Sequence, residues 1–265
     1  MGVLNVTPDS FSDGGRWYRR GSVALSEILD AAERMVEAGA HLLDVGGEST
    51  RPGARPVGVQ EEADRVLPVL EALCRIDVLV SLDTSKPEVA AQGIAAGCHL
   101  INDVQGLRNP EMVQVLAGSD VGVCLMHMRG EPRSMQADPR YDDVVIEIRD
   151  FFERQVQTCL HAGVEPERLA LDPGFGFGKA LEHNLTLLSA LEALRVSDLP
   201  LLVGLSRKSM LGTLTGRPVD EREVASAVVA ALAVERGADI VRVHDVGSTR
   251  DALRLVEALS EHREH

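Results

Sequence analysis

The sequence predicts a single (β/α)8 barrel, also called a TIM barrel, in which helices surround a closed parallel sheet. The chain has 265 residues, and barrels of this class use about 250 residues for one core. Short apolar runs alternate with longer helical patterns eight times, which is typical of parallel βα units. No linker rich in Pro, Gly or Ser divides the chain, so we expect one domain over residues 1–265.

The expected strands are short and rich in Val, Leu and Ile, as in parallel strands that are buried on both faces. They cover Val3 to Val6, His41 to Val45, Leu79 to Asp83, Leu100 to Val104, Val121 to Met126, Leu169 to Asp172, Leu201 to Leu205 and Ile240 to Val243. Because the first strand begins close to Met1, we expect the amino-terminal edge of the barrel to be frayed.

The expected helices lie between and after these strands. Four of them are followed closely by Gly39, Gly97, Gly163 and Gly237, and a glycine in the left-handed conformation is a common helix stop. The helices cover Ser22 to Ala38, Gln60 to Cys74, Lys86 to Ala96, Pro110 to Ala117, Asp142 to Ala162, Glu182 to Leu194, Asp220 to Glu235 and Ser248 to Leu259.

The same βα units can also form an open, doubly wound sheet. An open sheet that binds a dinucleotide carries a GxGxxG motif after its first strand, and this chain has NVTPDSFSDGG there. We therefore favour the closed barrel, whose active sites lie at the carboxyl ends of the strands.

Composition and charge exclude several classes of protein. Apolar residues make up 45% and charged residues 26% of the chain, which is globular rather than disordered usage. The net charge of −14 argues against nucleic acid or an anionic membrane as a partner. No apolar run reaches the roughly 18 residues of a membrane span and no signal peptide is evident, so we expect a cytoplasmic protein. The four cysteines form no CxxC pair, which gives little support to a thiolate metal site.

Lysine is rare among the basic residues. Of 27 basic residues only Lys86, Lys179 and Lys208 are lysines, and each lies just after an apolar run in a segment that contains Gly, Ser or Pro. A functional need for lysine at these places is one interpretation, and drift in composition is the other.

Cationic side chains cluster at the expected strand ends. Arg242 and His244 occupy alternate positions of one strand and should point the same way, and Arg207 and Lys208 end another strand. Together with Arg51, these groups suit a phosphate or a diphosphate in an otherwise acidic protein. Separate surface ion pairs are the alternative interpretation.

Asp83, Asn102 and Asp172 end three other strands. A carboxylate beside a carboxamide can bind the amino and ring N–H edge of a guanine-like heterocycle through paired hydrogen bonds, and a pterin carries that edge. For each aspartate alone, a helix cap or a group that orients a neighbour is the alternative. Three such side chains at one barrel mouth favour ligand binding.

Eight motifs follow one another along the chain. They are NVTPDSFSDGG at 5–15, DVGGESTRPGA at 44–54, DTSKPEVA at 83–90, INDV at 101–104, LMHMRG at 125–130, DPGFGFGK at 172–179, GLSRKS at 204–209 and RVHDV at 242–246. In these motifs the chain resembles the dihydropteroate synthases, the folate-pathway transferases that sulfonamides target. The resemblance implies a (β/α)8 homodimer that condenses 6-hydroxymethyl-7,8-dihydropterin diphosphate with 4-aminobenzoate to give 7,8-dihydropteroate and diphosphate.

The resemblance also implies which side chains contact each part of the substrates. The pterin contacts are Asp83, Asn102, Asp172 and Lys208, with Met126 and Gly204 shaping the slot. The diphosphate contacts are Asn5, Arg51, Arg242 and His244, and the aminobenzoate contacts are Thr50, Pro52, Phe177, Lys208 and Ser209. The catalytic set is Asp83, Asp172, Lys208, Arg242 and His244. Asn5 and phosphate oxygens would hold Mg²⁺, an ion that takes few protein ligands.

We expect an SN1-like reaction in which diphosphate leaves before the arylamine attacks a pterin methylene cation. Cations would stabilise the leaving group, while Asp83 and Asp172 would stabilise the electron-poor ring. Two other functions remain open, a pterin-dependent barrel like the corrinoid methyltransferases and a non-catalytic pterin-binding protein. A Schiff-base aldolase that uses Lys208 is a third alternative.

Two apolar helical stretches, SAVVAALAVE at 226–235 and DALRLVEALS at 251–260, are candidate surfaces for a homodimer. Ordinary packing against the barrel explains them equally well.

Overall fold

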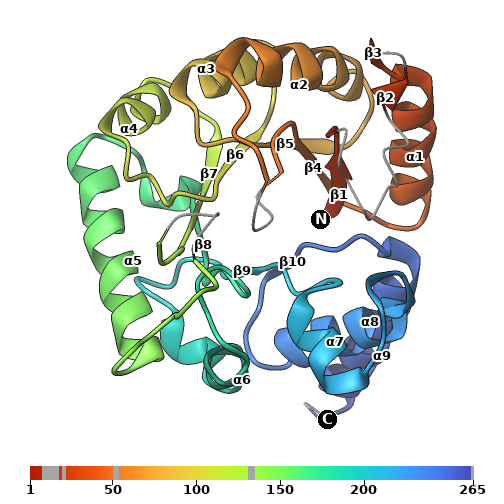
Figure 1. The fold of residues 1–265 in the computed structure, drawn as a ribbon, viewed down its shortest axis with the longest axis vertical. Coiled ribbons are helices and arrows are strands. Elements are labelled where there is room, and N and C mark those ends of the chain that lie inside the picture. Colours follow the sequence, from red (N-terminus) through yellow and green to blue (C-terminus); the bar gives the residue numbers. More distant parts are fainter. Residues whose placement is uncertain (8–17, 20–21, 50–53, 131–134, 264–265) are drawn as a thin grey trace.

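Eight parallel strands form the centre of the molecule (Figure 1). The computed structural model describes residues 1–7, 18–19, 22–49, 54–130 and 135–263. In this part of the chain the parallel strands are β1 (Gly2–Asn5), β4 (Leu42–Gly46), β5 (Leu79–Asp83), β6 (Leu100–Asp103), β7 (Gly122–Met126), β8 (Leu169–Asp172), β9 (Leu202–Val203) and β10 (Ile240–Val241). A separate antiparallel pair consists of β2 (Tyr18–Arg19) and β3 (Ser22–Val23).

The sheet closes on itself. Six strands pair in the order β1-β4-β5-β6-β7-β8, and β9 pairs with β10. Parallel bridges from Leu171 to Leu201 and from Gly2 to Val243 join these two sheets at both edges. The second junction is reinforced where the Val3 amide donates to the Val243 carbonyl over 3.1 Å. The prediction of a closed barrel is therefore confirmed, and the alternative of an open sheet is wrong.

The helices form a ring around the strands (Figure 1). In the described residues they are α1 (Leu25–Glu37), α2 (Val59–Leu73), α3 (Pro87–Ala95), α4 (Pro110–Ala117), α5 (Val144–His161), α6 (Leu181–Ser189), α7 (Ser209–Thr215), α8 (Glu223–Val234) and α9 (Val246–Arg263), with 3-10 turns at Pro166–Arg168, Leu191–Leu194 and Val219–Glu221. Gly39, Gly97, Gly163 and Gly237 have φ angles of +98°, +99°, +95° and +97°, so the predicted helix stops are confirmed.

Three helical regions differ from the sequence prediction. The helix expected to begin at Ser22 begins at Leu25, because Ser22 and Val23 pair with β2 as strand β3. The helix expected over 182–194 is divided into α6 and a 3-10 turn at its end. Helix α7 was not predicted, because its seven residues carry no clear apolar face and adjoin Gly216, which ends the helix with φ at +71°. This short helix follows β9 and carries Ser209, one of the expected substrate contacts, as its first residue.

Apolar side chains from three consecutive parallel strands pack together. Cys124, Ala170 and Leu202 form a buried cluster, against which Met1 packs. The amino-terminal ammonium of Met1 donates to the Val241 carbonyl over 3.0 Å. The expectation of a frayed amino-terminal edge is therefore wrong, since β1 is bonded from its beginning.

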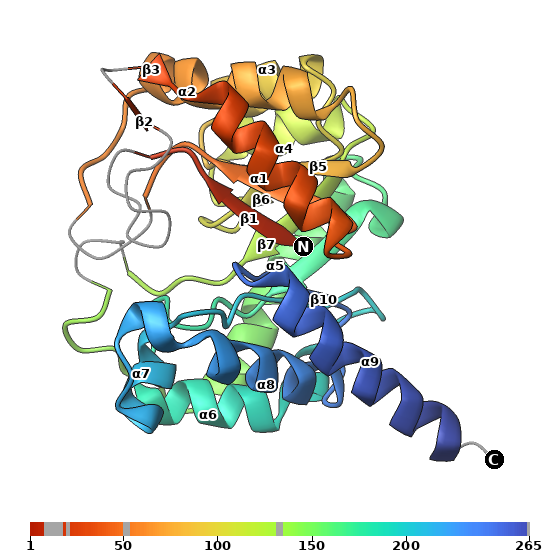
Figure 2. The ribbon, with the colours of Figure 1, turned by 90° about the vertical axis from the view of Figure 1, so that its right-hand side faces the viewer.

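Within the described residues, no helix has the length and apolar character needed to cross a membrane. All four cysteines are free thiols; Cys98, Cys124 and Cys159 are buried and Cys74 is partly exposed. The carboxyl-terminal part of α9 extends beyond the rest of the molecule (Figure 2).

Candidate active site

The strand register brings three of the predicted site positions, Asn5, Asp83 and Asn102, close together around Gly46. Asn5 on β1 is aligned with Gly46 on β4, Gly46 with Asp83 on β5, and Asp83 with Asn102 on β6. A Cβ atom at Gly46 would lie 3.7 Å from Asp83 Oδ2 and 3.8 Å from Asn5 Oδ1. Glycine at this position therefore leaves a gap between the two polar side chains at the carboxyl ends of the strands.

Arg242 crosses the barrel to meet these acids. Its Nε donates to Asp44 Oδ2 over 2.6 Å, and its Nη2 donates to Asp83 Oδ2 over 3.0 Å. The Asn102 amide nitrogen lies 3.4 Å from the same Asp44 oxygen. Asp44, Asp83 and Asn102, here called the acid-and-amide group, thus lie in one site with the cation Arg242. Asp44 was not among the predicted site residues. It lies within a buried strand, and its partner Arg242 is brought to it only by closure of the barrel.

These ion pairs set the electrostatics of the mouth. Burial and the negative charge of Asp44 raise the pKa of Asp83 to about 8, although Arg242 opposes the shift. Burial also disfavours the charged guanidinium, but the carboxylates of Asp44 and Asp83 outweigh it and raise the pKa of Arg242. One guanidinium between two carboxylates leaves an excess of negative charge, which favours a proton on Asp83.

Asp172 and Lys208 form the next part of the site. The Gly174 amide donates to Asp172 Oδ1 over 2.7 Å, while burial raises the pKa of Asp172. Lys208 Nζ lies 4.1 Å from the centroid of the Phe177 ring, within the range of a cation–π contact. Burial lowers the pKa of Lys208 to about 8, against the attraction of Asp172. Lys208 therefore lies between an acid and an aromatic face.

An apolar cluster lies beside these polar groups. Val104, Met126, Met128 and Met135 are buried together, and Phe177 packs against them. Met126 is aligned with Asp172 in the register of β7 and β8, so the cluster borders the acidic side of the mouth. Methionine and aromatic side chains adapt well to a flat ring, and an apolar surface with a few polar groups at its edge is typical of a small-molecule site.

His244 and Arg207 make separate contacts. His244 Nδ1 lies 3.0 Å from Ser206 Oγ, which also accepts from the His244 amide. Arg207 forms an ion pair with Asp245 at 2.6 Å. The ion pair with Asp245 agrees with the alternative interpretation of a separate ion pair for Arg207, and a part in the cationic cluster stays a prediction.

The remaining predicted positions lie at different distances from this cluster. Gly204 adjoins Arg242, whose Cβ would lie 3.9 Å from a Cβ at Gly204, and Ser209 is exposed at the start of α7. Thr50, Arg51 and Pro52 lie outside the described residues.

The donor set fits a magnesium ion only if a substrate supplies most of the ligands. Asn5 contributes one hard oxygen that faces the gap at Gly46. Among the described residues, no cluster of three His, Cys, Asp or Glu side chains could hold a metal. Mg²⁺ commonly uses one or two protein oxygens together with phosphates and water, so Asn5 is compatible with it.

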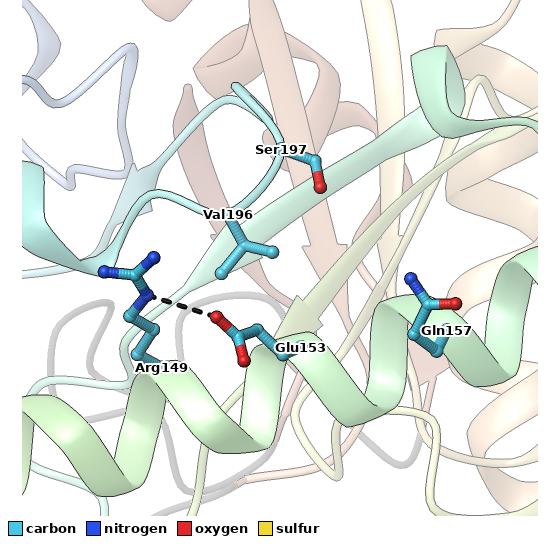
Figure 3. Close-up of a pocket in the computed structure, with 5 residues that line it drawn as sticks. All are labelled: Arg149, Glu153, Gln157, Val196 and Ser197. Atoms are coloured by element: carbon cyan, nitrogen blue, oxygen red, sulfur yellow. Dashed lines mark hydrogen bonds and ion pairs between the residues drawn. The ribbon is translucent and has the colours of Figure 1, made fainter.

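A cavity of about 390 Å³ lies elsewhere, between α5 and the segment that leads to β9 (Figure 3). It is lined by Arg149, Glu153, Gln157, Val196 and Ser197, and an ion pair of 3.2 Å joins Arg149 to Glu153. None of the predicted site residues lines it, so it is separate from the barrel mouth.

The closed barrel and its mouth define a class of enzyme that binds a flat, nitrogen-rich ring beside an anionic group. The pterin binding enzyme family matches residues 1–244. The dihydropteroate synthase of Escherichia coli K12 is 50% identical over 97% of this chain and 90% of its own length. That of Neisseria meningitidis serogroup B is 47% identical over 98% and 92%.

Solved structures agree with these relatives. The Yersinia pestis dihydropteroate synthase in complex with a sulfonamide drug has a TM-score of 0.94 and 50% identity, with 98% of this chain and 94% of that chain covered. The Burkholderia cenocepacia enzyme complexed with 7,8-dihydropteroate has a TM-score of 0.89 and 47% identity, covering 100% and 92%. The chain belongs to the pterin-binding enzymes and, within them, to the dihydropteroate synthase family, as the motifs indicated.

The pKa of Lys208 predicts a pH dependence. Burial lowers this pKa to about 8, so the ammonium is charged below that pH and loses its charge as the pH rises through it. We expect kcat/KM of the synthase reaction to fall above about pH 8, because this parameter reports ionisations of the free enzyme. Lys208→Arg should remove the fall, since a guanidinium keeps its proton. Rate profiles of both proteins from about pH 6 to about pH 10 provide the check. Because the pKa of Asp83 is also raised to about 8, the assignment is contradicted when the profile of Lys208→Arg has the same shape as that of the parent enzyme.

Proposed function

We propose that this chain condenses 6-hydroxymethyl-7,8-dihydropterin diphosphate with 4-aminobenzoate, forming 7,8-dihydropteroate and diphosphate for folate biosynthesis. The observation that carries the proposal is the direct contact between the acid-and-amide group and Arg242 in one barrel mouth. A substrate with a hydrogen-bonding ring at one end and a diphosphate at the other needs both kinds of group within a few ångströms. The relatives that bind dihydropteroate and a sulfonamide support the same substrates.

The pterin ring is proposed to lie against Met126 and the apolar cluster around it. Asp83, Asn102 and Asp172 would then bind the ring nitrogens and the amino group. Asp83, whose pKa is raised to about 8, can donate or accept a hydrogen bond near neutral pH, which suits a ring edge that carries both donors and acceptors.

The diphosphate is proposed to face Asn5, Arg51, Arg242 and His244. The bond between the methylene carbon and the diphosphate oxygen breaks first, and the electron pair leaves with the oxygen. Cations held in place before the reaction stabilise this charge without reorganising. The carboxylates near the ring stabilise the positive charge that remains on the pterin methylene.

The arylamine then forms the new carbon–nitrogen bond and loses a proton. Phe177, Lys208 and Ser209, with Thr50 and Pro52, are proposed to hold the aminobenzoate. Lys208 lies beside both Asp172 and Phe177, so it can contact both substrates at their junction. Mg²⁺, bound by Asn5 and diphosphate oxygens, would supply further positive charge to the leaving group. We propose a cytoplasmic location, as the sequence analysis expected.

Turnover with both substrates tests the proposed function. We expect purified protein to form dihydropteroate in the presence of Mg²⁺, detected by chromatography, and to lose this activity when EDTA is added. Restoration by excess Mg²⁺ controls for other effects of the chelator. A protein that binds the dihydropterin diphosphate without releasing diphosphate would instead support a non-catalytic pterin-binding protein.

Arg242→Ala should lower kcat/KM at least about 100-fold, the scale of removing one group that stabilises a transition state. Arg195 is the matched control, since it also forms ion pairs with two carboxylates, Glu192 and Asp239, but lies away from the mouth. We expect Arg195→Ala to keep near-normal rates. Initial rates and thermal unfolding of both variants are measured together, and near-normal turnover of folded Arg242→Ala would contradict its role.

We propose a homodimer formed through α8 and α9. Val224, Val228 and Leu232 follow one another at four-residue spacing on α8 and are 75%, 52% and 37% exposed. Leu255 and Leu259 repeat this spacing on α9, which packs against α8. Grouped apolar side chains on adjacent helices mark an interaction surface more strongly than single ones. A symmetric dimer would cover the same patch on both copies.

Val228→Glu should convert the dimer into a monomer, because it places a charge in the centre of the proposed interface. Ile146→Glu is the matched control, since Ile146 is 58% exposed on α5, away from α8 and α9. Light scattering after size-exclusion chromatography gives the mass of each variant. A dimer that survives Val228→Glu, or a monomeric parent protein, would overturn this interface.

A further inference from the structure

Lys179 is a buried lysine that the reaction described above does not use, and burial lowers its pKa well below the usual value. Its side chain is 3% exposed, and it follows the glycine-rich segment 173–178 after β8. Nζ lies 2.9 Å from the Gly174 carbonyl, 3.1 Å from the Phe177 carbonyl and 3.3 Å from the His127 carbonyl. His127 Nδ1 lies 3.0 Å away. The amino group therefore joins the loop after β7 to the loop after β8.

The backbone of segment 173–178 depends on such a donor. Gly174, Gly176 and Gly178 have φ angles of +67°, +76° and +67°, a region that glycine adopts easily. The turns direct the carbonyls of Gly174 and Phe177 toward the interior, where an acceptor without a donor is costly. Lys179 Nζ donates to the Phe177 carbonyl and is a second donor to the Gly174 carbonyl, which also accepts from the Phe177 amide.

An arginine would not serve in this place. Four acceptors surround one nitrogen, which suits the compact head of a lysine, whereas a guanidinium spreads its donors over a plane. His127 can act as an acceptor there, because burial, together with the charge of Lys179, lowers its pKa to about 2 and leaves the ring neutral. Arg108 and Arg129, which also face this group, act in the same direction.

The segment carries two groups of the site. Phe177 places its ring 4.1 Å from Lys208 Nζ, and its amide donates to the Gly174 carbonyl over 3.0 Å. The backbone of Asp172 is held by the barrel, since its carbonyl accepts from the His127 amide over 2.8 Å, whereas its carboxylate accepts from the Gly174 amide at the start of the segment. Loss of the Lys179 contacts should therefore displace Phe177 more than Asp172.

We propose that Lys179 is a positioning residue, whose amino group holds segment 173–178 in the form that places the Phe177 ring against Lys208. This inference rests on the proposed function, in which Phe177 borders the aminobenzoate and Asp172 borders the pterin. In this role Lys179 contributes to the binding of the arylamine and not to the rate of the chemical step.

The test compares Lys179→Met, Lys179→Gln and the parent enzyme. For Lys179→Met we expect KM for 4-aminobenzoate to rise about 10-fold, because the segment would then adopt the form that binds the arylamine in about one molecule in ten. KM for the dihydropterin diphosphate should change less than about 3-fold, because Asp172 keeps its place. Lys179→Gln should recover part of the loss, since its amide retains two N–H donors.

Tyr141→Phe is the control variant. The Tyr141 hydroxyl donates to the Gly178 carbonyl of the same segment over 2.9 Å, but it contacts neither the Gly174 nor the Phe177 carbonyl. We expect both KM values of this variant to stay near those of the parent. Parallel losses in kcat and both KM values of Lys179→Met, without recovery in Lys179→Gln, would overturn the proposal in favour of a general structural role.

A crystal structure of Lys179→Met gives a readout that does not depend on activity. We expect segment 173–178 to shift and the contact between Phe177 and Lys208 to be lost. An unchanged segment would overturn the positioning role even if the parent enzyme were active. A parent enzyme that forms no dihydropteroate would contradict the proposed function instead, and the crystal structure would still decide the role of Lys179.

Discussion

The site depends on the placement of one guanidinium between two carboxylates. Arg242 reaches from β10 to Asp44 on β4 and Asp83 on β5, so the pairs join strands that are far apart in the sequence. Removal of one partner would leave a buried charge without compensation, which is far more costly than the pair is stabilising. The same contact keeps a cation next to acids that bind a ring, which gives the mouth its two kinds of surface.

This arrangement explains how an acidic chain can handle an anionic leaving group. With a net charge of −14, the protein attracts few anions at long range, so positive charge must be concentrated locally. Arg242 is held by internal carboxylates, and Lys208 lies beside Asp172 with a pKa lowered to about 8 by burial. Oriented charges of both signs can stabilise a cationic ring and a departing anion at the same time, because the two charges develop at different ends of the substrate.

The sequence predicted the features that local patterns determine. Apolar runs, glycine stops and polar residues at strand ends sufficed for the barrel and for one mouth that contains Asp83, Asn102 and Arg242. The pairing of charges was not predictable, because it depends on how strands meet after closure. Arg207, for example, pairs with Asp245, and the sequence alone could not distinguish this from a role beside Arg242.

The rare lysines acquire a physical reason in the structure. Lys86 Nζ donates to both Glu48 and Glu62, Lys179 Nζ contacts three carbonyl oxygens, and Lys208 Nζ lies over an aromatic ring. In each place a single, compact nitrogen contacts its partners, whereas arginine presents a wide, planar set of donors. The convergence of several acceptors on one nitrogen therefore gives a physical reason for lysine at positions 86 and 179, whereas an aromatic ring accommodates either cation at position 208.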